Sequence, residues 1–269
     1  MKQNLHTHTK YFDGADTPEE MILAAMEKDF RSIGFSEHTF MTYSSFCDNM
    51  TDRTLEYKKE VFELKEKYKD QIKVYCGLEA DLYHNTDLSG YDYLIGSVHY
   101  VKNSGRYIHY DTTGEALKKT VQTVYDNDGL KLAADYYSTM ATLWKYGNFD
   151  IIGHFDIIAK QSENGEIFDP SSKEYLKFAF EAIGALKGKI PLFEVNTGAI
   201  ARGYRKNPYP SIPIIKEFKR QGFGVVITSD CHNKNFLDCY FKEAAELLKE
   251  CGYKEKYVLT DSGFAAVSL

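Results

Sequence analysis

The sequence lacks the segments that mark several large classes of protein. It has no apolar run near the ~20 residues of a membrane-spanning helix, and residues 1–10 carry no apolar core of a secretory signal. Its 5 cysteines are an odd number, and no two of them form a Cys-x-x-Cys pair. This pattern favours reduced thiols over a disulfide framework or a zinc ribbon. We therefore expect a soluble, cytoplasmic protein that makes no membrane contact.

The sequence also lacks an excess of basic residues. It has 33 Lys and Arg against 39 Asp and Glu, a net charge of −6. A protein that grips nucleic acid needs a basic surface, so nucleic acid is not an expected partner. No repeat, low-complexity tract or linker divides the 269 residues. That length fits one large α/β barrel or two small domains, and we expect a single domain over residues 1–269.

Seven short apolar runs predict buried strands. They cover residues 3–6, 32–36, 72–78, 93–97, 150–153, 191–195 and 224–228. Helices are predicted between and after them, at residues 17–28, 53–69, 171–186, 210–220 and 241–251, with one or two more in 113–146. Seven strand–helix units predict a closed or nearly closed parallel barrel. Residues 257–260 are either an eighth strand or a tail. A doubly wound open sheet is the alternative, although no Gly-x-Gly-x-x-Gly motif supports its dinucleotide-binding form.

Polar side chains follow every predicted strand. Six of the eight histidines lie at these ends: His6, His8, His38, His99, His154 and His232. Barrel enzymes place their active sites at the carboxyl ends of the strands. Residues two apart in an extended segment point to the same side, so one ion can contact both His6 and His8. Clustered imidazoles and carboxylates in a dry site need a cation, and mixed nitrogen and oxygen ligands suit zinc, iron or manganese.

The other two histidines, His84 and His109, lie in polar loop sequence, and we interpret them as structural. The sequences HTH (6–8), SEH (36–38), GLEAD (77–81), GSVH (96–99), GHFD (153–156) and SDCH (229–232) together resemble the polymerase and histidinol phosphatase (PHP) family. The length and the sequence GSVHYV are similar to its stand-alone histidinol-phosphate phosphatases.

The resemblance implies a distorted (β/α)7 barrel of the TIM-like type that holds two or three divalent metal ions. Its ligands carry over in three sets. The implied sets are His6, His8, Glu79 and Asp230 for the first metal, Glu79, His99 and His154 for the second, and Asp13, His38 and His232 for the third.

The resemblance also implies hydrolysis of a phosphate monoester. The substrate expected is L-histidinol phosphate, a small phosphorylated metabolite of histidine biosynthesis. We hypothesise attack on phosphorus by a hydroxide that bridges two metals. Asp13 and His232 are the candidate catalytic residues, and the proton for the leaving group comes from Asp13 or from a metal-bound water.

Basic residues in the loops after the strands are candidates for phosphate binding. They are Lys160, Arg202, Arg205 and Lys102, whereas Arg106 is expected to be a surface charge.

Three other functions remain open. The chain could be a PHP phosphoesterase acting on another small ester or on nucleic acid. It could be an amidohydrolase, although Glu79 stands where those enzymes often use a carboxylated lysine. It could also be a metal-binding module without catalysis, which its full ligand set disfavours.

Overall fold

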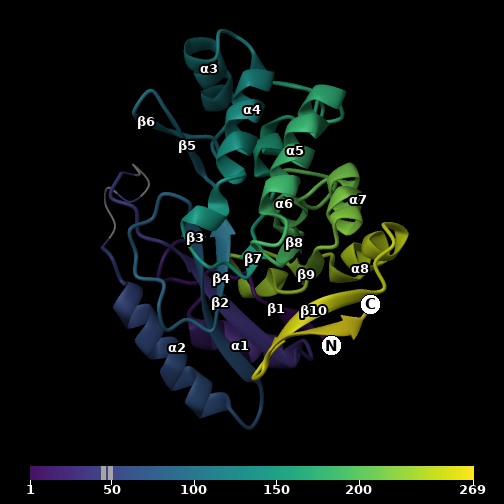
Figure 1. Ribbon diagram of the computed structural model, residues 1–269. Helices are drawn as coiled ribbons and strands as arrows, with labels where there is room; N and C mark the ends of the chain where they lie inside the picture. Colours follow the sequence, from purple (N-terminus) through teal and green to yellow (C-terminus); the bar gives the residue numbers. More distant parts are fainter. Residues whose placement is uncertain (44–46, 48–50) are drawn as a thin grey trace.

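A parallel sheet of seven strands forms the centre of the computed structural model, which describes residues 1–43, 47 and 51–269 (Figure 1). The strands are β1 Gln3–Asn4, β2 Ser32–His38, β3 Lys73–Asp81, β4 Tyr93–Ser97, β7 Ile151–Ile152, β8 Leu192–Asn196 and β9 Gly224–Thr228. They lie in the order β1-β2-β3-β4-β7-β8-β9, and all neighbouring pairs are parallel. Thr7 and Cys231, just past the carboxyl ends of the two outer strands, form a parallel bridge, so the sheet nearly closes. The predicted seven-stranded barrel is confirmed.

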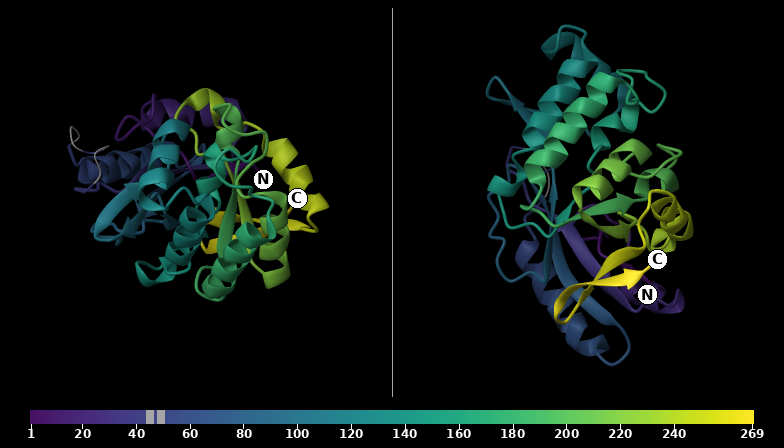
Figure 2. Two further views of the ribbon diagram at one scale, coloured as in Figure 1. Left: turned by 90° about the horizontal axis from the view of Figure 1, so that it is seen from above. Right: turned by 45° about the vertical axis from the view of Figure 1, so that its right-hand side comes forward.

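Helices surround the strands (Figure 2, left). They are α1 Pro18–Glu27, α2 Thr54–Tyr68, α3 Gly114–Val124, α4 Gly129–Met140, α5 Lys173–Leu186, α6 Gly198–Ala201, α7 Ile212–Gln221 and α8 Phe241–Glu250, with short 3-10 turns η2 Leu143–Lys145, η3 Ile157–Gln161 and η4 Lys234–Phe236. Thr17 and Glu20 form a capping box that starts α1. The stretch 113–146 contains two helices, because Asp126 and Asn127 both adopt positive φ and end the first one.

The lower interior of the barrel is packed around Tyr93. Its buried hydroxyl donates a hydrogen bond to the backbone carbonyl of Leu5 at 2.5 Å. The ring fits because β2 and β3 carry glycine beside it. A Cβ on Gly34 or Gly77 would come within 2.5 Å or 2.3 Å of Tyr93 atoms. The barrel is thus filled by side chains below the level of the strand ends.

Residues 257–260 are not an eighth barrel strand. They belong to β10 Glu255–Thr260, which pairs antiparallel with β11 Gly263–Ser268. The side chain of Gln3 bonds both the N–H and the carbonyl of Leu259, so this hairpin covers the amino ends of the barrel strands (Figure 2, right). The pattern of residues 257–260 correctly indicated a strand. That strand pairs with β11 and not with a strand of the barrel, which is why it does not extend the barrel sheet.

A second hairpin was not predicted. Strands β5 Tyr100–Asn103 and β6 Arg106–His109 follow β4 and pair antiparallel. Their turn contains Ser104 and Gly105, both with positive φ. This Ser-Gly pair, between the β-rich stretches 100–101 and 107–108, was the sequence signal for it.

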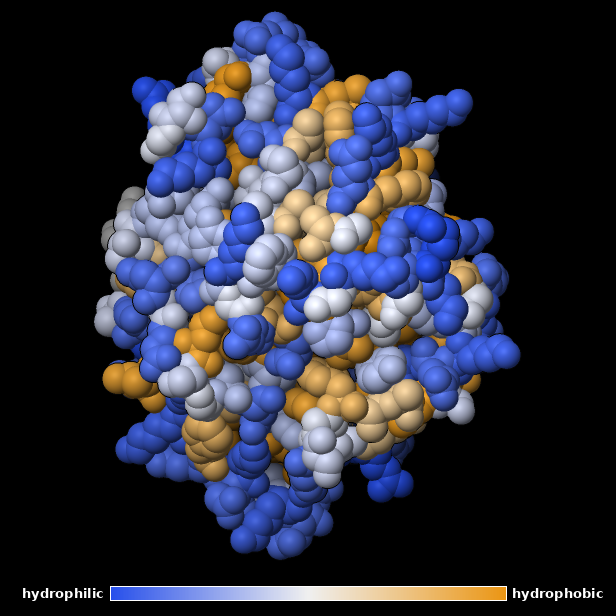
Figure 3. All heavy atoms as spheres, viewed as in Figure 1, coloured by the Kyte–Doolittle hydropathy of each residue, from blue (hydrophilic) through white to orange (hydrophobic). Residues whose placement is uncertain are grey.

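Hydrophilic side chains predominate on the face of the molecule shown in Figure 3, with apolar ones in small groups between them. Within the described residues, every helix is too short or too polar to cross a membrane.

Candidate metal centre

Glu79, at the carboxyl end of β3, lies at the middle of the predicted ligands and is 1% exposed. Imidazole nitrogens of five histidines lie within 3.5 Å of its two carboxylate oxygens. The distances are 3.2 Å to His6, 3.5 Å to His8, 2.9 Å to His38, 3.5 Å to His99 and 2.8 Å to His154. The strand order explains this convergence, because these histidines end or follow β1, β2, β4 and β7, whose carboxyl ends share one end of the barrel.

The first implied set forms across the seam between β1 and β9. Asp230 Oδ1 lies 3.6 Å from His6 Nε2 and 3.2 Å from His8 Nε2. The three side chains offer ligand atoms that all lie within 4.8 Å of one another. Asp230 has a positive φ of 45°, a conformation that costs a non-glycine residue free energy. The backbone is therefore held in a sparsely populated conformation where the carboxylate meets the two imidazoles.

The second implied set lies on the opposite side of Glu79. The Nε2 atoms of His99 and His154 face each other at 3.3 Å, and both lie near Glu79 Oε1. Their rings are tilted by 60°, so the nitrogens rather than the ring faces are opposed. Two such nitrogens and one carboxylate oxygen are ligands typical of zinc or iron.

The third implied set is more exposed. Asp13 Oδ2 lies 3.0 Å from His232 Nε2 and 3.7 Å from His38 Nε2. His8 joins this set as well, since its ring stacks between those of His38 and His232 with centroids 4.3 Å away on each side. The structure therefore brings all nine predicted ligands together, and His6, His8, His38 and Glu79 each belong to two groups of neighbouring ligand atoms.

The donor atoms of this cluster fit cations. His6 Nε2, both ring nitrogens of His8 and Glu79 Oε2 are buried without a hydrogen-bond partner. Leaving such atoms unpaired costs about 1–3 kcal/mol each. Metal ions would satisfy all of them at once, because the unpaired nitrogens and oxygen face the same small volume.

The pKa shifts of the cluster also fit a site that binds cations. Burial alone would raise the pKa of Glu79, but His6, His38 and His99 hold it well below its ordinary value. Burial, with help from His38 and His232, lowers the pKa of His8 to about 3, which keeps this imidazole neutral. Glu79 raises the pKa of His38 to about 10, against the effect of burial. Ionised carboxylates and neutral imidazoles are the forms that bind metals, and a cation would replace the proton on His38.

Two buried carboxylates that the sequence did not assign orient the ligands. Glu194 Oε2, in β8, lies 2.8 Å from His6 Nδ1, and Glu194 Oε1 accepts the backbone N–H of His154 at 2.6 Å. Asp81 accepts the backbone N–H of His99 at 2.9 Å. Metal-binding histidines commonly have such carboxylate partners. The available signal was a single acid within an apolar strand end, LFEVN, and the second acid of GLEAD.

The four predicted phosphate-binding residues have different surroundings. Arg202 lies in the cluster, where Nη1 donates to the carbonyl of Asp230 at 2.7 Å and lies 3.2 Å from His232 Nδ1. Lys160 Nζ donates to Asp111 Oδ1 at 2.6 Å.

The structure does not bring Arg205 and Lys102 to the ligands. Arg205 is buried, its guanidinium lies 3.2 Å from Asp156, and it covers the ring of Tyr209. Lys102 is exposed on β5, with Nζ 5.1 Å from the Tyr107 ring centre.

A cavity of about 180 Å³ adjoins the cluster. It is lined by Phe12, Asp13, His38, Met41, His99, Tyr100, His109 and Asp111. His109 therefore lies in its wall, where the ring stacks on Tyr100 at 4.7 Å. Burial lowers the pKa of His109 to about 4, so it is uncharged at neutral pH.

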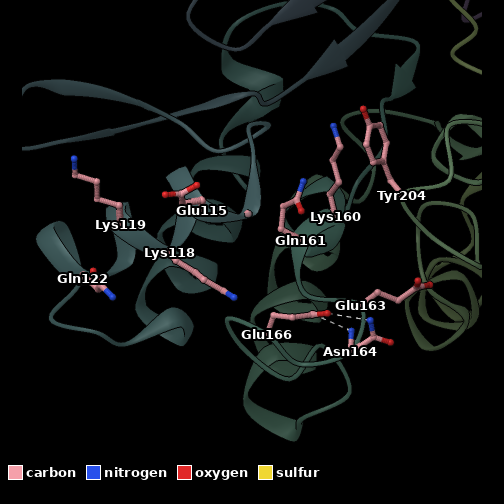
Figure 4. Close-up of a pocket in the computed structure, with 11 residues that line it drawn as sticks. Glu115, Lys118, Lys119, Gln122, Lys160, Gln161, Glu163, Asn164, Glu166 and Tyr204 are labelled. Carbon is pink, nitrogen blue, oxygen red and sulfur yellow. Dashed lines mark hydrogen bonds between the residues drawn. The ribbon is translucent and has the colours of Figure 1, made fainter.

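A larger cavity of about 770 Å³ lies between α3 and η3, away from the predicted ligands (Figure 4). Lys160 and Tyr204 lie side by side at one end of it, with Lys160 Nζ 4.4 Å from the ring centre. Lys160 connects the two cavities, because the same ammonium group bonds Asp111 in the wall of the smaller one.

The site and fold are those of a known family. Residues 4–197 match the PHP domain family, so the chain belongs to it. The chain is 26% identical to a probable histidinol-phosphatase of Schizosaccharomyces pombe, over 92% of this chain and 86% of that protein. It is 24% identical to the histidinol-phosphatase of Lactococcus lactis, over 94% of this chain and 93% of that protein.

The crystal structure of the Lactococcus lactis histidinol phosphate phosphatase, in complex with zinc, L-histidinol and phosphate, has a similar fold. The TM-score is 0.75, the identity 22%, and the alignment covers 98% of each chain. The Listeria monocytogenes structure of a putative histidinol phosphatase gives a TM-score of 0.74 at 20% identity, over 90% of this chain and 99% of that one. The TIM-like barrel expected from the sequence is thus confirmed a second time.

Proposed function

We propose that this protein is a metal-dependent phosphatase that hydrolyses L-histidinol phosphate to L-histidinol and phosphate, in histidine biosynthesis. The observation that carries the proposal is the convergence of five imidazoles on one buried carboxylate, Glu79, beside a small cavity. The names of the related proteins, and the ligands bound in the Lactococcus lactis structure, support the choice of substrate.

Two or three divalent ions would be held by the three sets of ligands. The residues proposed to hold them, in the sets that the family resemblance implies, are His6, His8, Glu79 and Asp230, then Glu79, His99 and His154, then Asp13, His38 and His232. Such ions neutralise phosphoryl oxygens and lower the pKa of a bound water toward ~7.

Arg202 is placed to bind the phosphoryl group. Its guanidinium is anchored by Asp230, which raises the pKa of Arg202 above its ordinary value despite burial, so the group stays charged. With a side chain 32% exposed, it can still offer N–H groups to an anion. A planar guanidinium suits phosphate oxygens because it donates paired hydrogen bonds.

Asp13 is not the acid that protonates the leaving group in this proposal. Burial alone would raise its pKa, but His38 and His232 hold it below its ordinary value, so the carboxylate is ionised at neutral pH. We therefore assign Asp13 to ligand binding. His232, whose Nε2 lies 3.0 Å from Asp13 Oδ2, remains the catalytic candidate of this pair.

The substrate is small in this proposal. A cavity of about 180 Å³ is below the ~300–1,000 Å³ of pockets for drug-sized ligands. It fits the carbon skeleton of an amino alcohol better than a run of nucleotides. The net charge of −6 also disfavours nucleic acid.

We also propose that residues 1–269 act as one domain. The matched family region ends at residue 197, yet Asp230 and His232 lie in the cluster with His6 and His8. The site is therefore incomplete without the later residues. Cytoplasmic location stays a prediction from the sequence.

The test is turnover of a panel of phosphate esters by the metal-loaded protein, together with elemental analysis. The panel holds L-histidinol phosphate, sugar phosphates, an amide substrate of amidohydrolases and single-stranded DNA. We expect L-histidinol phosphate to give the highest kcat/KM. A higher value for another ester would contradict the substrate, and full turnover after rigorous chelation would contradict the metal-dependent mechanism.

A further inference from the structure

Asp111 stands in the wall of the small cavity without belonging to the metal-binding sets. It follows Tyr110, which is 1% exposed and fixes the loop between β6 and α3 in the core. Two side chains of η3 hold the loop from the other side. Lys160 Nζ donates to Asp111 Oδ1 at 2.6 Å, and Gln161 Nε2 donates to the carbonyl of Thr112 at 3.0 Å. The carboxylate is thus held in place rather than carried on a free loop.

One oxygen of Asp111 is available to a ligand. The side chain is 25% exposed and faces the cavity shared with Asp13 and His99. The hydrogen bond from Lys160 uses Oδ1, and within the described residues Oδ2 accepts none. Burial alone would raise the pKa of Asp111, but Lys160 and His99 lower it, so the carboxylate is ionised. An ionised carboxylate on a cavity wall favours a cationic group in the molecule bound there.

The charge pattern divides the site into two parts. The metal-binding cluster and Arg202 favour the phosphate dianion, whereas on the side of Asp111 the ammonium of Lys160 pairs with Oδ1 and leaves Oδ2 to accept a hydrogen bond from a ligand. An ester that carries an ammonium group near its phosphate would match both parts. The stacked rings of Tyr100 and His109 offer a flat surface for the remainder of the molecule.

We propose that Asp111 is a specificity-determining residue, whose carboxylate accepts the primary ammonium group of the alcohol part of the substrate while Lys160 fixes its position. This inference rests on the proposed phosphatase function and deepens it. It assigns the amine contact to one carboxylate in the loop between β6 and α3.

The competing role is indirect. Asp111 could hold Lys160 so that the lysine binds the phosphate. The two roles predict different losses, because an amine contact affects only molecules that carry the amine. A contact made through Lys160 affects every phosphate ester and inorganic phosphate itself.

The experiment compares wild-type protein with Asp111→Asn, both loaded with metal. The substrates are L-histidinol phosphate and the analogue that lacks the amine, imidazolylpropanol phosphate. We expect the ratio of the two kcat/KM values to fall by about 10–100-fold in the variant, as for loss of a hydrogen bond to a charged group. An unchanged ratio, with both values lowered together, would overturn the proposal.

Calorimetry provides a readout independent of turnover. The variant should bind L-histidinol at least about tenfold more weakly and inorganic phosphate as the wild type does. Weaker phosphate binding with unchanged L-histidinol binding would assign Asp111 to positioning Lys160 and overturn the proposal. Failure of the wild type to hydrolyse either ester would refute the proposed function, whereas loss of L-histidinol binding in the variant would still support the amine contact.

Asp126→Asn is the matched control, because it removes the same charge from an exposed position that pairs with Lys131. Its substrate ratio should equal that of the wild type. Melting curves and metal content establish that each variant is folded and loaded. If Asp111→Asn does not fold, Asp111→Ser removes the carboxylate with a smaller polar side chain and is judged by the same two readouts.

Discussion

The two ends of residues 3–8, the segment that begins with strand β1, carry polar side chains in opposite states. At the amino end, Gln3 Nε2 donates to Ser32 Oγ at 2.6 Å, and Oε1 accepts the N–H of Leu259 at 2.7 Å. Asn4 Nδ2 likewise donates to Ser229 Oγ at 2.7 Å. At the carboxyl end, His6 Nε2 and both ring nitrogens of His8 have no hydrogen-bond partner. All four side chains are buried.

This difference separates buried polar side chains that stabilise the fold from buried polar side chains that bind a ligand. Buried polar groups that the protein itself satisfies stabilise the fold, as Gln3 does by tying β1 to the C-terminal hairpin. Buried groups left unpaired beside one another indicate a ligand that supplies what the protein does not. Substitutions at the amino end should therefore change stability, and substitutions at the carboxyl end should change activity and metal content.

Replacing the central carboxylate should have the largest effect. Glu79→Gln keeps the size of the side chain but removes the negative charge shared by five imidazoles. We expect kcat/KM to fall by about 10³-fold or more, because metal binding supplies several kcal/mol of transition-state stabilisation. Metal content, measured by elemental analysis, should fall with it. Glu63→Gln, on the exposed face of α2, is the control and should change neither. Normal activity and metal loading in Glu79→Gln would contradict the assignment of the unpaired side chains to a metal site.

Arg205→Met tests a paired charge near the carboxyl end of the barrel. The substitution leaves Asp156 buried without its ion-pair partner. We expect the free energy of unfolding to fall by about 3–5 kcal/mol. Denaturant unfolding measures the loss, and kcat and KM of the folded protein should stay near wild type. The double variant Arg205→Met/Asp156→Asn should recover part of the stability. A large rise in KM instead would show that Arg205 binds the phosphate, as the sequence predicted.

Glu194→Gln should weaken the metal site without removing a ligand. Glu194 orients His6 through Nδ1 and His154 through its backbone N–H. We expect metal affinity or activity to fall by about 10–100-fold, as for other carboxylates that support metal-binding histidines. Metal titration followed by activity measures this, and excess metal should restore part of the turnover. Glu181→Gln, on the exposed face of α5, serves as the control.

Arg202→Ala should affect substrate binding more than metal loading. We expect KM for the phosphate ester to rise by about tenfold, the loss typical of a charged hydrogen bond. Metal content should be unchanged. The control is Arg220→Ala, which removes an exposed arginine from the end of α7. A loss of bound metal with unchanged KM would mean that Arg202 acts by holding Asp230.

Gln3→Ala should have the smallest effect on chemistry. The substitution leaves the N–H and the carbonyl of Leu259 without their side-chain partner. We expect a loss of about 1–3 kcal/mol in the free energy of unfolding, with kcat per folded molecule unchanged. Thermal and denaturant unfolding measure it. A fall in kcat without a loss of stability would contradict the division between the two ends of residues 3–8.

The sequence predicted the barrel well because the strands are short apolar runs bounded by polar residues. The paired strands β2 and β8 begin within one residue of the predicted runs. The pattern of residues 257–260 did predict extended backbone, and the Ser262-Gly263 pair after it is a turn signal that the prediction did not use. The place of the hairpin beside the barrel has no local signal. That place depends on Gln3, more than 250 residues away in the chain.

Most of the metal-binding residues were predictable because they lie in or just after the carboxyl end of a strand, and parallel strands bring these ends together. Asp13 lies in a loop and was predicted from the family resemblance alone. The loop residues were not predictable in the same way. Arg205 has the charge and the loop position expected of a phosphate-binding residue. Its guanidinium instead forms an ion pair with Asp156, which is distant in sequence. Asp111 follows strand β6 of the hairpin that was not predicted, so the sequence analysis gave it no strand-end position.

Metal ions would also stabilise the closure of the barrel between its two outer strands, β1 and β9. Just past the carboxyl ends of β1 and β9, the Thr7–Cys231 bridge joins the two backbones, and His8 N donates a hydrogen bond to Cys231 O at 3.0 Å. Beside it, His6 and His8 on one edge face Asp230 on the other. An ion held jointly by these side chains would link the first strand of the barrel to the last. Loss of metal would then loosen the cylinder at this joint before the paired strands elsewhere separate.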